Sequence, residues 1–212
     1  MKNLKKIAAL ALTASMMFSM AGCAMGGKLS SKKLIASAKD YGCEEIKDAD
    51  DFAEMIDEGE DLEDGAYITV DGKDAKDIFK ANDIIDGLYD SSIKSTTFVV
   101  IADEELNNAA FLVCMTFANK KDAQDYYDDQ VEDVEDIEDS GYDVELDDGE
   151  EKGVTYTCVN GDTGLFLVSE GLYVSGSNVY AIVGFGYGGS DDYEDFIEDI
   201  GGCYDVMLPT EL

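Results

Sequence analysis

The chain has 212 residues and carries 48 acidic and 15 basic side chains, so its formal net charge at pH 7 is −33. It contains no histidine, arginine or tryptophan, which excludes Ser-His-Asp and Cys-His catalytic pairs, histidine-bound zinc and arginine clamps on phosphate. Because so acidic a chain repels phosphate, we expect no nucleic-acid partner. We recognise no catalytic, cofactor-binding or metal-binding motif and interpret the chain as a non-catalytic protein.

The N-terminus combines a basic start with a short apolar run. Met1–Lys6 contains three lysines. Ile7–Met20 is a run of 14 largely apolar residues, and Ala21-Gly22-Cys23 follow it. A membrane-spanning helix needs about 20 residues, so the run is too short to span a bilayer. A basic segment, an apolar segment and small residues before a cysteine together resemble the signal peptide of bacterial lipoproteins.

This resemblance covers only about the first 25 residues and implies where in the cell the protein is located. It implies cleavage between Gly22 and Cys23 and attachment of acyl chains, such as palmitate, to Cys23. Residues 1–22 would then be the signal peptide, residues 23–31 the lipidated cysteine with a short tether, and residues 32–212 a single acidic domain. A subdivision of this domain near residues 92–95 is an alternative. The protein would be anchored by lipid to the extracytoplasmic side of the cell membrane.

The sequence pattern predicts mainly helices in the first half of the domain. Ser31 is expected to cap a helix through Tyr41, and a second helix runs from Asp50 to Gly59. A short strand at 66–70 precedes a third helix, which the apolar spacing from Ala75 to Leu88 indicates. Four lysines lie at the start of this region: Lys28, Lys32, Lys33 and Lys39. They either contact the anionic lipids of a membrane leaflet or form a solvated helix face.

The second half is rich in strands. Asn119 is expected to cap a helix whose apolar face extends to Ile137, and Ser190 to cap a last helix containing Tyr193 and Ile197. The expected strands are 96–102, 109–118, 142–146, 154–159, 165–168, 172–174 and 179–185, separated by turn residues such as Glu170-Gly171. The order of elements predicts an α+β fold, with an antiparallel sheet of about five to seven strands covered by helices on one face.

Four cysteines remain after Cys23: Cys43, Cys114, Cys158 and Cys203. They are either buried thiols of the core or, in an exported protein, partners in a disulfide. Cys43 and Cys203 each follow a glycine at an expected helix end and form the most plausible pair. The absence of a C-x-x-C motif removes a redox centre from consideration.

A block of 16 carboxylates occupies Asp122–Glu151 without a single lysine. The segment starting at Asp139 does not match a calcium-binding EF-hand loop. Gly141 stands where an oxygen ligand is needed, and Val144 stands where a glycine is needed. A solvated acidic surface is therefore favoured, with weak calcium binding as the alternative. The many aromatic residues are expected mainly in the core, and Gly184–Gly189 is expected to be a flexible connection from strand to helix.

These observations favour a membrane-anchored lipoprotein of the cell envelope that serves a binding, scaffolding or accessory role, with an envelope protein or glycan as partner. One alternative is a surface protein that binds divalent cations with low affinity. The other is a hydrolase of envelope glycan, which would need two carboxylates about 5–9.5 Å apart in an apolar cleft.

Overall fold

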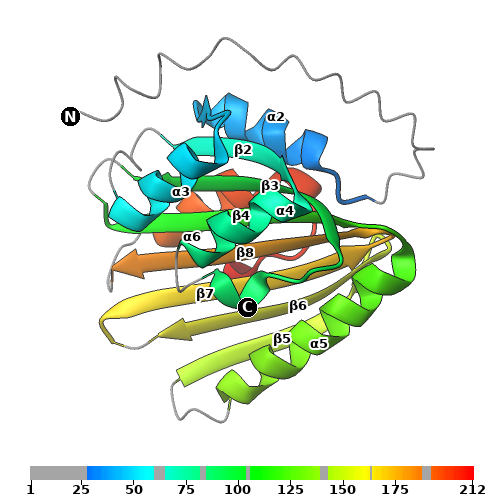
Figure 1. The fold of residues 1–212 in the computed structure, drawn as a ribbon. Coiled ribbons are helices and arrows are strands. Elements are labelled where there is room, and N and C mark those ends of the chain that lie inside the picture. Colours follow the sequence, from blue (N-terminus) through cyan, green and yellow to red (C-terminus); the bar gives the residue numbers. More distant parts are fainter. Residues whose placement is uncertain are drawn as a thin grey trace.

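The computed structural model describes residues 28–59, 65–81, 85–103, 106–138, 143–162, 164–187 and 192–212. Within this part, the chain forms one eight-stranded sheet and five α-helices (Figure 1). The expected signal peptide, including Gly22 and Cys23, lies outside the described residues. None of the helices in the described part is both long enough and apolar enough to cross a membrane.

The sheet is almost entirely antiparallel and has the strand order β1-β2-β3-β4-β8-β7-β6-β5. Only the two-residue strand β1 runs parallel to its neighbour β2. The sheet is thus mixed and larger than the five to seven strands expected. The strands are β1 (Glu44–Glu45), β2 (Ala66–Asp71), β3 (Ile93–Ala102), β4 (Asn108–Phe117), β5 (Asp143–Glu151), β6 (Val154–Asp162), β7 (Phe166–Ser175) and β8 (Asn178–Tyr187).

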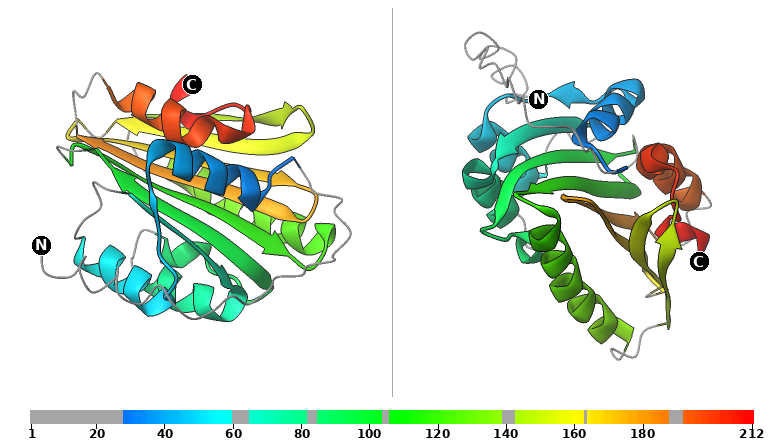
Figure 2. Two further views of the ribbon diagram at one scale, coloured as in Figure 1. Left: turned by 90° about the horizontal axis from the view of Figure 1, so that it is seen from above. Right: turned by 90° about the vertical axis from the view of Figure 1, so that its right-hand side faces the viewer.

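Helices cover both faces of the sheet, so the expectation of a single covered face is wrong (Figure 2). One face carries α3 (Ala49–Glu58), α4 (Gly72–Lys80) and α5 (Lys120–Glu138). The other face carries α2 (Ser31–Tyr41) and α6 (Tyr193–Gly201). Each face has its own apolar core, and the sheet separates the two cores.

The central strands explain this two-sided arrangement. In β3, Phe98 and Val100 belong to the core beneath α3 and α4, whereas Val99 and Ile101 belong to the core beneath α2 and α6. A strand that is buried on both faces reads as a continuous apolar run rather than as an alternation. The run Phe98-Val99-Val100-Ile101 therefore requires cover on both sides of the sheet.

Two glycines expected in a flexible connection lie inside strand β8. A Cβ atom on Gly184 would lie 2.6 Å from Cδ1 of Ile197, and one on Gly186 would lie 2.6 Å from Cδ2 of Tyr193. The two glycines therefore let α6 pack closely on the sheet. Ser190, the expected cap of this helix, lies outside the described residues, and α6 begins at Tyr193.

Strand β7 continues through Glu170-Gly171, where a turn was expected. A Cβ atom on Gly171 would lie 2.5 Å from the hydroxyl oxygen of Tyr173. That hydroxyl donates a hydrogen bond to the carbonyl of Met207, at 2.8 Å. The glycine makes room for a buried tyrosine and does not turn the chain.

Asparagine and aspartate side chains define where several helices begin. Asp48 accepts a hydrogen bond from the backbone N–H of Asp50 at the start of α3, and Asp71 accepts one from Lys73 at the start of α4. Helix α4 ends at Lys80, so the expected helix through Leu88 is shorter, and a separate 3₁₀ turn forms at Asp86–Leu88.

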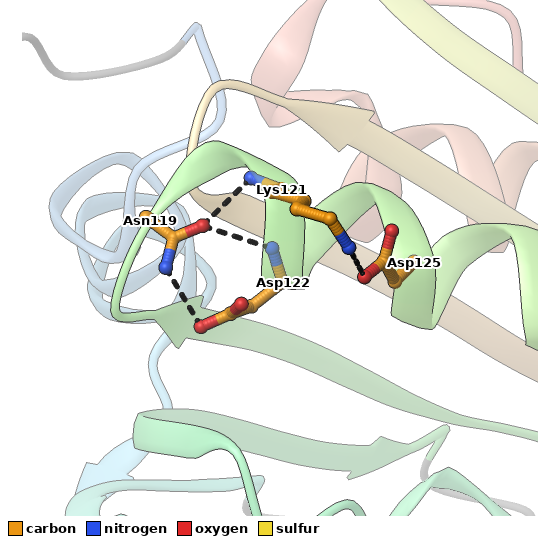
Figure 3. Close-up of polar contacts among 4 residues, drawn as sticks. All are labelled: Asn119, Lys121, Asp122 and Asp125. Carbon is orange, nitrogen blue, oxygen red and sulfur yellow. Dashed lines mark hydrogen bonds and ion pairs between the residues drawn. The ribbon is translucent and has the colours of Figure 1, made fainter.

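Asn119 caps α5 as expected (Figure 3). Its side-chain oxygen accepts hydrogen bonds from the backbone N–H groups of Lys121 and Asp122, at 2.9 and 3.1 Å. Its side-chain nitrogen donates to the carboxylate of Asp122, and Lys121 forms an ion pair with Asp125 one turn later. These contacts fix the point at which the chain leaves β4.

Helix α5 carries the chain across one face of the sheet, from β4 to the edge strand β5. Four strand spacings of about 4.8 Å separate these strands, a distance of about 19 Å. The 19 residues of α5 span about 28 Å, which is enough for a diagonal crossing. The hydroxyl of Tyr126 secures the helix by donating to the carbonyl of Leu88, at 2.9 Å.

Candidate functional site

The strand registers define two opposite ends of the sheet. We call the end that contains Ile93, Val154 and Asn178 the base, and the end that contains Ala102, Phe166 and Tyr187 the tip. In Figure 1 the base lies to the right and the tip to the left. Strands of nine or ten residues separate the two ends by about 30 Å.

The base holds the start of the described chain. Leu29 is 0% exposed in the core beneath α2 and α6. The side chain of Asn178 donates a hydrogen bond to the carbonyl of Leu29, and the hydroxyl of Tyr204 donates one to the carbonyl of Ser30, at 2.8 Å. Residues 29 and 30, which were expected in the tether, are therefore packed into the domain.

The tip gathers exposed apolar side chains. Five large apolar residues are exposed in the described part of the chain, and four of them lie at the tip. These four are Leu106 (58% exposed), Leu165 (66%), Phe166 (45%) and Tyr187 (59%). Phe166 and Tyr187 are cross-strand partners, with ring centroids 5.4 Å apart in an edge-to-face arrangement. The fifth residue, Tyr41, is 43% exposed at the end of α2, which lies toward the same end of the sheet beside Ile101.

Asp103 organises the connection between β3 and β4 that carries Leu106. Its carboxylate accepts hydrogen bonds from the backbone N–H groups of Asn107 and Asn108, at 2.8 and 3.1 Å. It also accepts one from the side chain of Asn108, at 2.9 Å. The carbonyl of Asn107 in turn accepts a hydrogen bond from the N–H of Tyr187, at 2.7 Å. These bonds join the Leu106 segment to the aromatic pair.

Leu106 has a left-handed backbone conformation, with φ of 57°. This region is unfavourable for a side chain with a Cβ atom and is usually occupied by glycine or asparagine. Such strain concentrates at binding and catalytic sites, where the surrounding structure maintains it. Leu106 is therefore both exposed and strained, which singles it out within the tip.

The four cysteines of the described chain are free thiols, and no disulfide joins Cys43 to Cys203. Burial raises the pKa of Cys43 and of Cys114 to about 11. Burial likewise raises the pKa of Cys158 and of Cys203 to about 12. The thiols therefore stay protonated at neutral pH and lack the thiolate form that acts as a nucleophile.

A group of buried tyrosines lies beside these thiols in the core beneath α2 and α6. The rings of Tyr173 and Tyr180 stack with centroids 5.5 Å apart, and Tyr204 meets Tyr180 edge to face at 4.6 Å. Burial raises the pKa of Tyr173 and of Tyr180 well above the usual value. These aromatics fill the core, as expected for most of the aromatic residues.

A small cavity lies between α2, α6 and the sheet and has space for about one water molecule. It is lined mainly by apolar side chains, among them Leu34, Val99, Leu112 and Ile200, and no carboxylate lines it. It is therefore a packing defect beside Cys43 and lacks the paired acids that glycan hydrolysis requires.

The acidic block divides between two elements at the periphery of the fold. Its first half lies on α5, and its second half forms the edge strand β5 from Asp143 to Glu151, longer than the strand expected at 142–146. The start of the tested calcium loop, Asp139 to Gly141, lies outside the described residues. Within the described residues, no group of three or more acidic or thiol side chains is placed to hold a metal ion.

No family model and no curated protein matches the chain. Among solved structures, it is similar to the extracellular domain of PknH from Mycobacterium tuberculosis, with a TM-score of 0.39 and 7% sequence identity. The match covers 58% of this chain and 68% of that chain. Neither a shared family nor a shared function follows from similarity at this level.

The left-handed conformation of Leu106 leads to a stability prediction. Replacing Leu106 by Asn should raise the free energy of unfolding by about 0.5–1 kcal/mol, because asparagine tolerates this conformation better. Leu165→Asn is the matched control, since Leu165 is 66% exposed, against 58% for Leu106, but has no positive φ. Urea unfolding of both variants would measure the difference, and a destabilised Leu106→Asn protein would contradict the prediction.

The raised thiol pKa values lead to a prediction of pH dependence. A thiol in the unfolded chain ionises near its ordinary pKa of 9.0, whereas burial raises the pKa of Cys158 in the folded protein to about 12. The unfolded chain therefore binds fewer protons between these values, so stability is fully present below pH 9 and falls as pH rises. The expected result is a decline in unfolding free energy that begins near pH 9 and continues toward about pH 12. A Cys158→Ala protein should be less stable but show a shallower decline, and equal slopes would refute the assignment.

Proposed function

We propose that the protein is a lipid-anchored, extracytoplasmic binding domain of the cell envelope that presents its tip to a partner protein. The observation that carries the binding role is the concentration of exposed apolar side chains at the end of the sheet opposite Leu29. A chain that is anchored through Cys23 and enters the fold at the base would keep its tip clear of the membrane.

The composition of the tip favours a protein partner over a glycan. Protein interfaces are enriched in aromatic side chains whose burial supplies much of the binding energy. Phe166 and Tyr187 offer such side chains, and the two leucines extend the patch with aliphatic surface that offers no ring for a sugar to stack on. The hydrogen bonds of Asp103 hold one part of the patch in place before binding, which lowers the entropic cost of association.

The chemistry of the described residues supports a non-catalytic role. The groups with strongly shifted pKa values are thiols and phenols, and burial raises these pKa values. The groups therefore stay neutral, whereas an activated nucleophile is deprotonated. With no histidine in the chain, a general base at neutral pH would have to be a carboxylate of raised pKa or a lysine of lowered pKa. The described carboxylates that are exposed on α5 are Asp125, Asp128, Asp129 and Glu132, and those on β5 are Glu145, Asp148 and Glu150.

Lipid attachment is tested by removing the thiol that would carry the acyl chains. The Cys23→Ala protein should incorporate no fatty-acid analogue during metabolic labelling and should leave the membrane fraction. Cys43→Ala is the matched control, because Cys43 is a buried core thiol. Equal labelling of the Cys23→Ala and unaltered chains would refute the lipoprotein assignment.

Binding at the tip is tested by cross-linking in the native membrane. A photoreactive amino acid at position 165 should give a discrete adduct with a second protein, and Tyr187→Ala should abolish this adduct by removing half of the aromatic pair. Tyr41→Ala should leave it intact, because Tyr41, although at the same end of the sheet, lies at the end of α2 and outside the β7–β8 aromatic pair. An adduct that survives Tyr187→Ala, or one formed with glycan only, would contradict a protein partner at the tip.

A further inference from the structure

Most lysines of the domain collect at the base. Eight of the 12 lysines that follow Cys23 lie there: one just before α2, five in the first turns of α2, α4 and α5, one at the start of β3, and one at the turn between β5 and β6. All eight are exposed: Lys28, Lys32, Lys33, Lys73, Lys94, Lys120, Lys121 and Lys152. Residues that are far apart in sequence thus form one surface, because three helices begin at the same end of the sheet.

This surface differs from the lysine cluster that the sequence alone indicates. Lys39 lies in the last turn of α2, away from the base, and its ammonium group sits 5.6 Å from the centroid of the Tyr67 ring. The side chain of Lys28 lies beside the turn between β5 and β6, where a Cβ atom on Gly153 would be 3.3 Å from its Nζ. The grouping is therefore a product of the fold and extends well beyond the N-terminal segment.

Five carboxylates at the base are engaged in local contacts within the described part of the chain, whereas the exposed side chains of Asp74 and Glu150, at the same end, are not. Asp71 caps α4, and Asp122 accepts a hydrogen bond from Asn119. Asp125 pairs with Lys121, while Glu151 and Asp205 both pair with Lys152. Within the described residues, the other six base lysines have no carboxylate within ion-pair distance. The ammonium group of Lys33 lies 5.9 Å from the centroid of the Tyr204 ring, and those of the other five are available to an external anion.

The chain enters the domain at this same surface. Leu29 is buried at the base, and six residue steps separate it from Cys23, a reach of about 20 Å when fully extended. Given the lipid anchor proposed above, the base is the part of the domain that must lie nearest the bilayer.

We propose that the base docks on the anionic phospholipid headgroups of the membrane that holds the anchor. The six unpaired lysines and the two in ion pairs face the lipid phosphates, while the acidic residues of α5 and β5 are repelled by the same surface. Attraction at one end and repulsion elsewhere select a single orientation, with the tip directed away from the membrane. The inference rests on the proposed function, because it requires the lipid anchor to bring the base within a Debye length of the headgroups.

The test is lysine acetylation of the full-length, lipid-anchored protein in vesicles, followed by peptide mass spectrometry. Vesicles of phosphatidylcholine alone are compared with vesicles that also contain phosphatidylglycerol. The eight base lysines should react at least about threefold more slowly on the anionic vesicles. The four remaining lysines, Lys39, Lys47, Lys76 and Lys80, are internal controls and should react equally on both. High salt should remove the protection.

Matched charge reversals separate docking from a general effect of net charge. Lys32→Glu with Lys33→Glu should abolish protection of the other base lysines, whereas Lys76→Glu with Lys80→Glu, which changes net charge equally, should preserve it. Uniform reactivity of all lysines on the anionic vesicles would overturn the docking but leave the anchor intact. A chain that fails to associate with either vesicle would instead overturn the proposed function on which the docking depends.

Discussion

The pairing of β8 with β4 is the contact on which the rest of the structure depends. The register runs from Asn108 opposite Gly186 at the tip to Thr116 opposite Asn178 at the base. Through its first residue, Asn178, β8 holds the carbonyl of Leu29, and through its last, Tyr187, it bonds the connection that carries Leu106. The same strand therefore fixes both ends of the molecule. It can do so only after α5 has carried the chain to the far edge and three strands have brought it back.

Charge is arranged around this apolar centre in a way that limits its cost. The acidic block lies along α5 and the edge strand β5, and most of its carboxylates whose side chains the structure describes are exposed. Like charges one helical turn apart cost a few tenths of a kcal/mol each, a loss that the two buried cores can offset. Acidic side chains along an edge strand also oppose pairing with the edge of another sheet. The block thus has a structural role that requires no bound cation.

Local signals in the sequence predicted local structure in part: α2 spans Ser31–Tyr41, but Ser31 is its first residue and not its cap. Asn119 was identifiable as a cap because its side chain satisfies N–H groups only two and three residues away. The glycines of β8 and β7 were misread because their partners, Tyr193, Ile197 and Tyr173, are placed against them by the fold. The continuous run from Phe98 to Ile101 did contain the evidence for a sheet covered on both faces, since a half-exposed strand would alternate.

The candidate surfaces were less predictable because they are made of separate segments. Leu165-Phe166 and Tyr187 look like ordinary strand residues, and only the pairing of β7 with β8 brings the two rings together. The strain at Leu106 is a property of the backbone that no residue pattern in this segment reveals. The lysines of the base come from five separate elements and turns, so the sequence shows only those that cluster near Lys28.

The geometry also limits where a partner can be found. Given the lipid anchor and the docking proposed above, the tip would stand about 30 Å above the headgroups, the length of the central strands. Even with the residues before Leu29 fully extended, their reach adds only about 20 Å. A partner of the tip must therefore lie within about 50 Å of the bilayer. This favours a membrane protein, or a protein held at the same membrane, over a component of the distant envelope. If the tip binds a partner as proposed, the strain at Leu106 and the exposure of Phe166 are costs that this role explains.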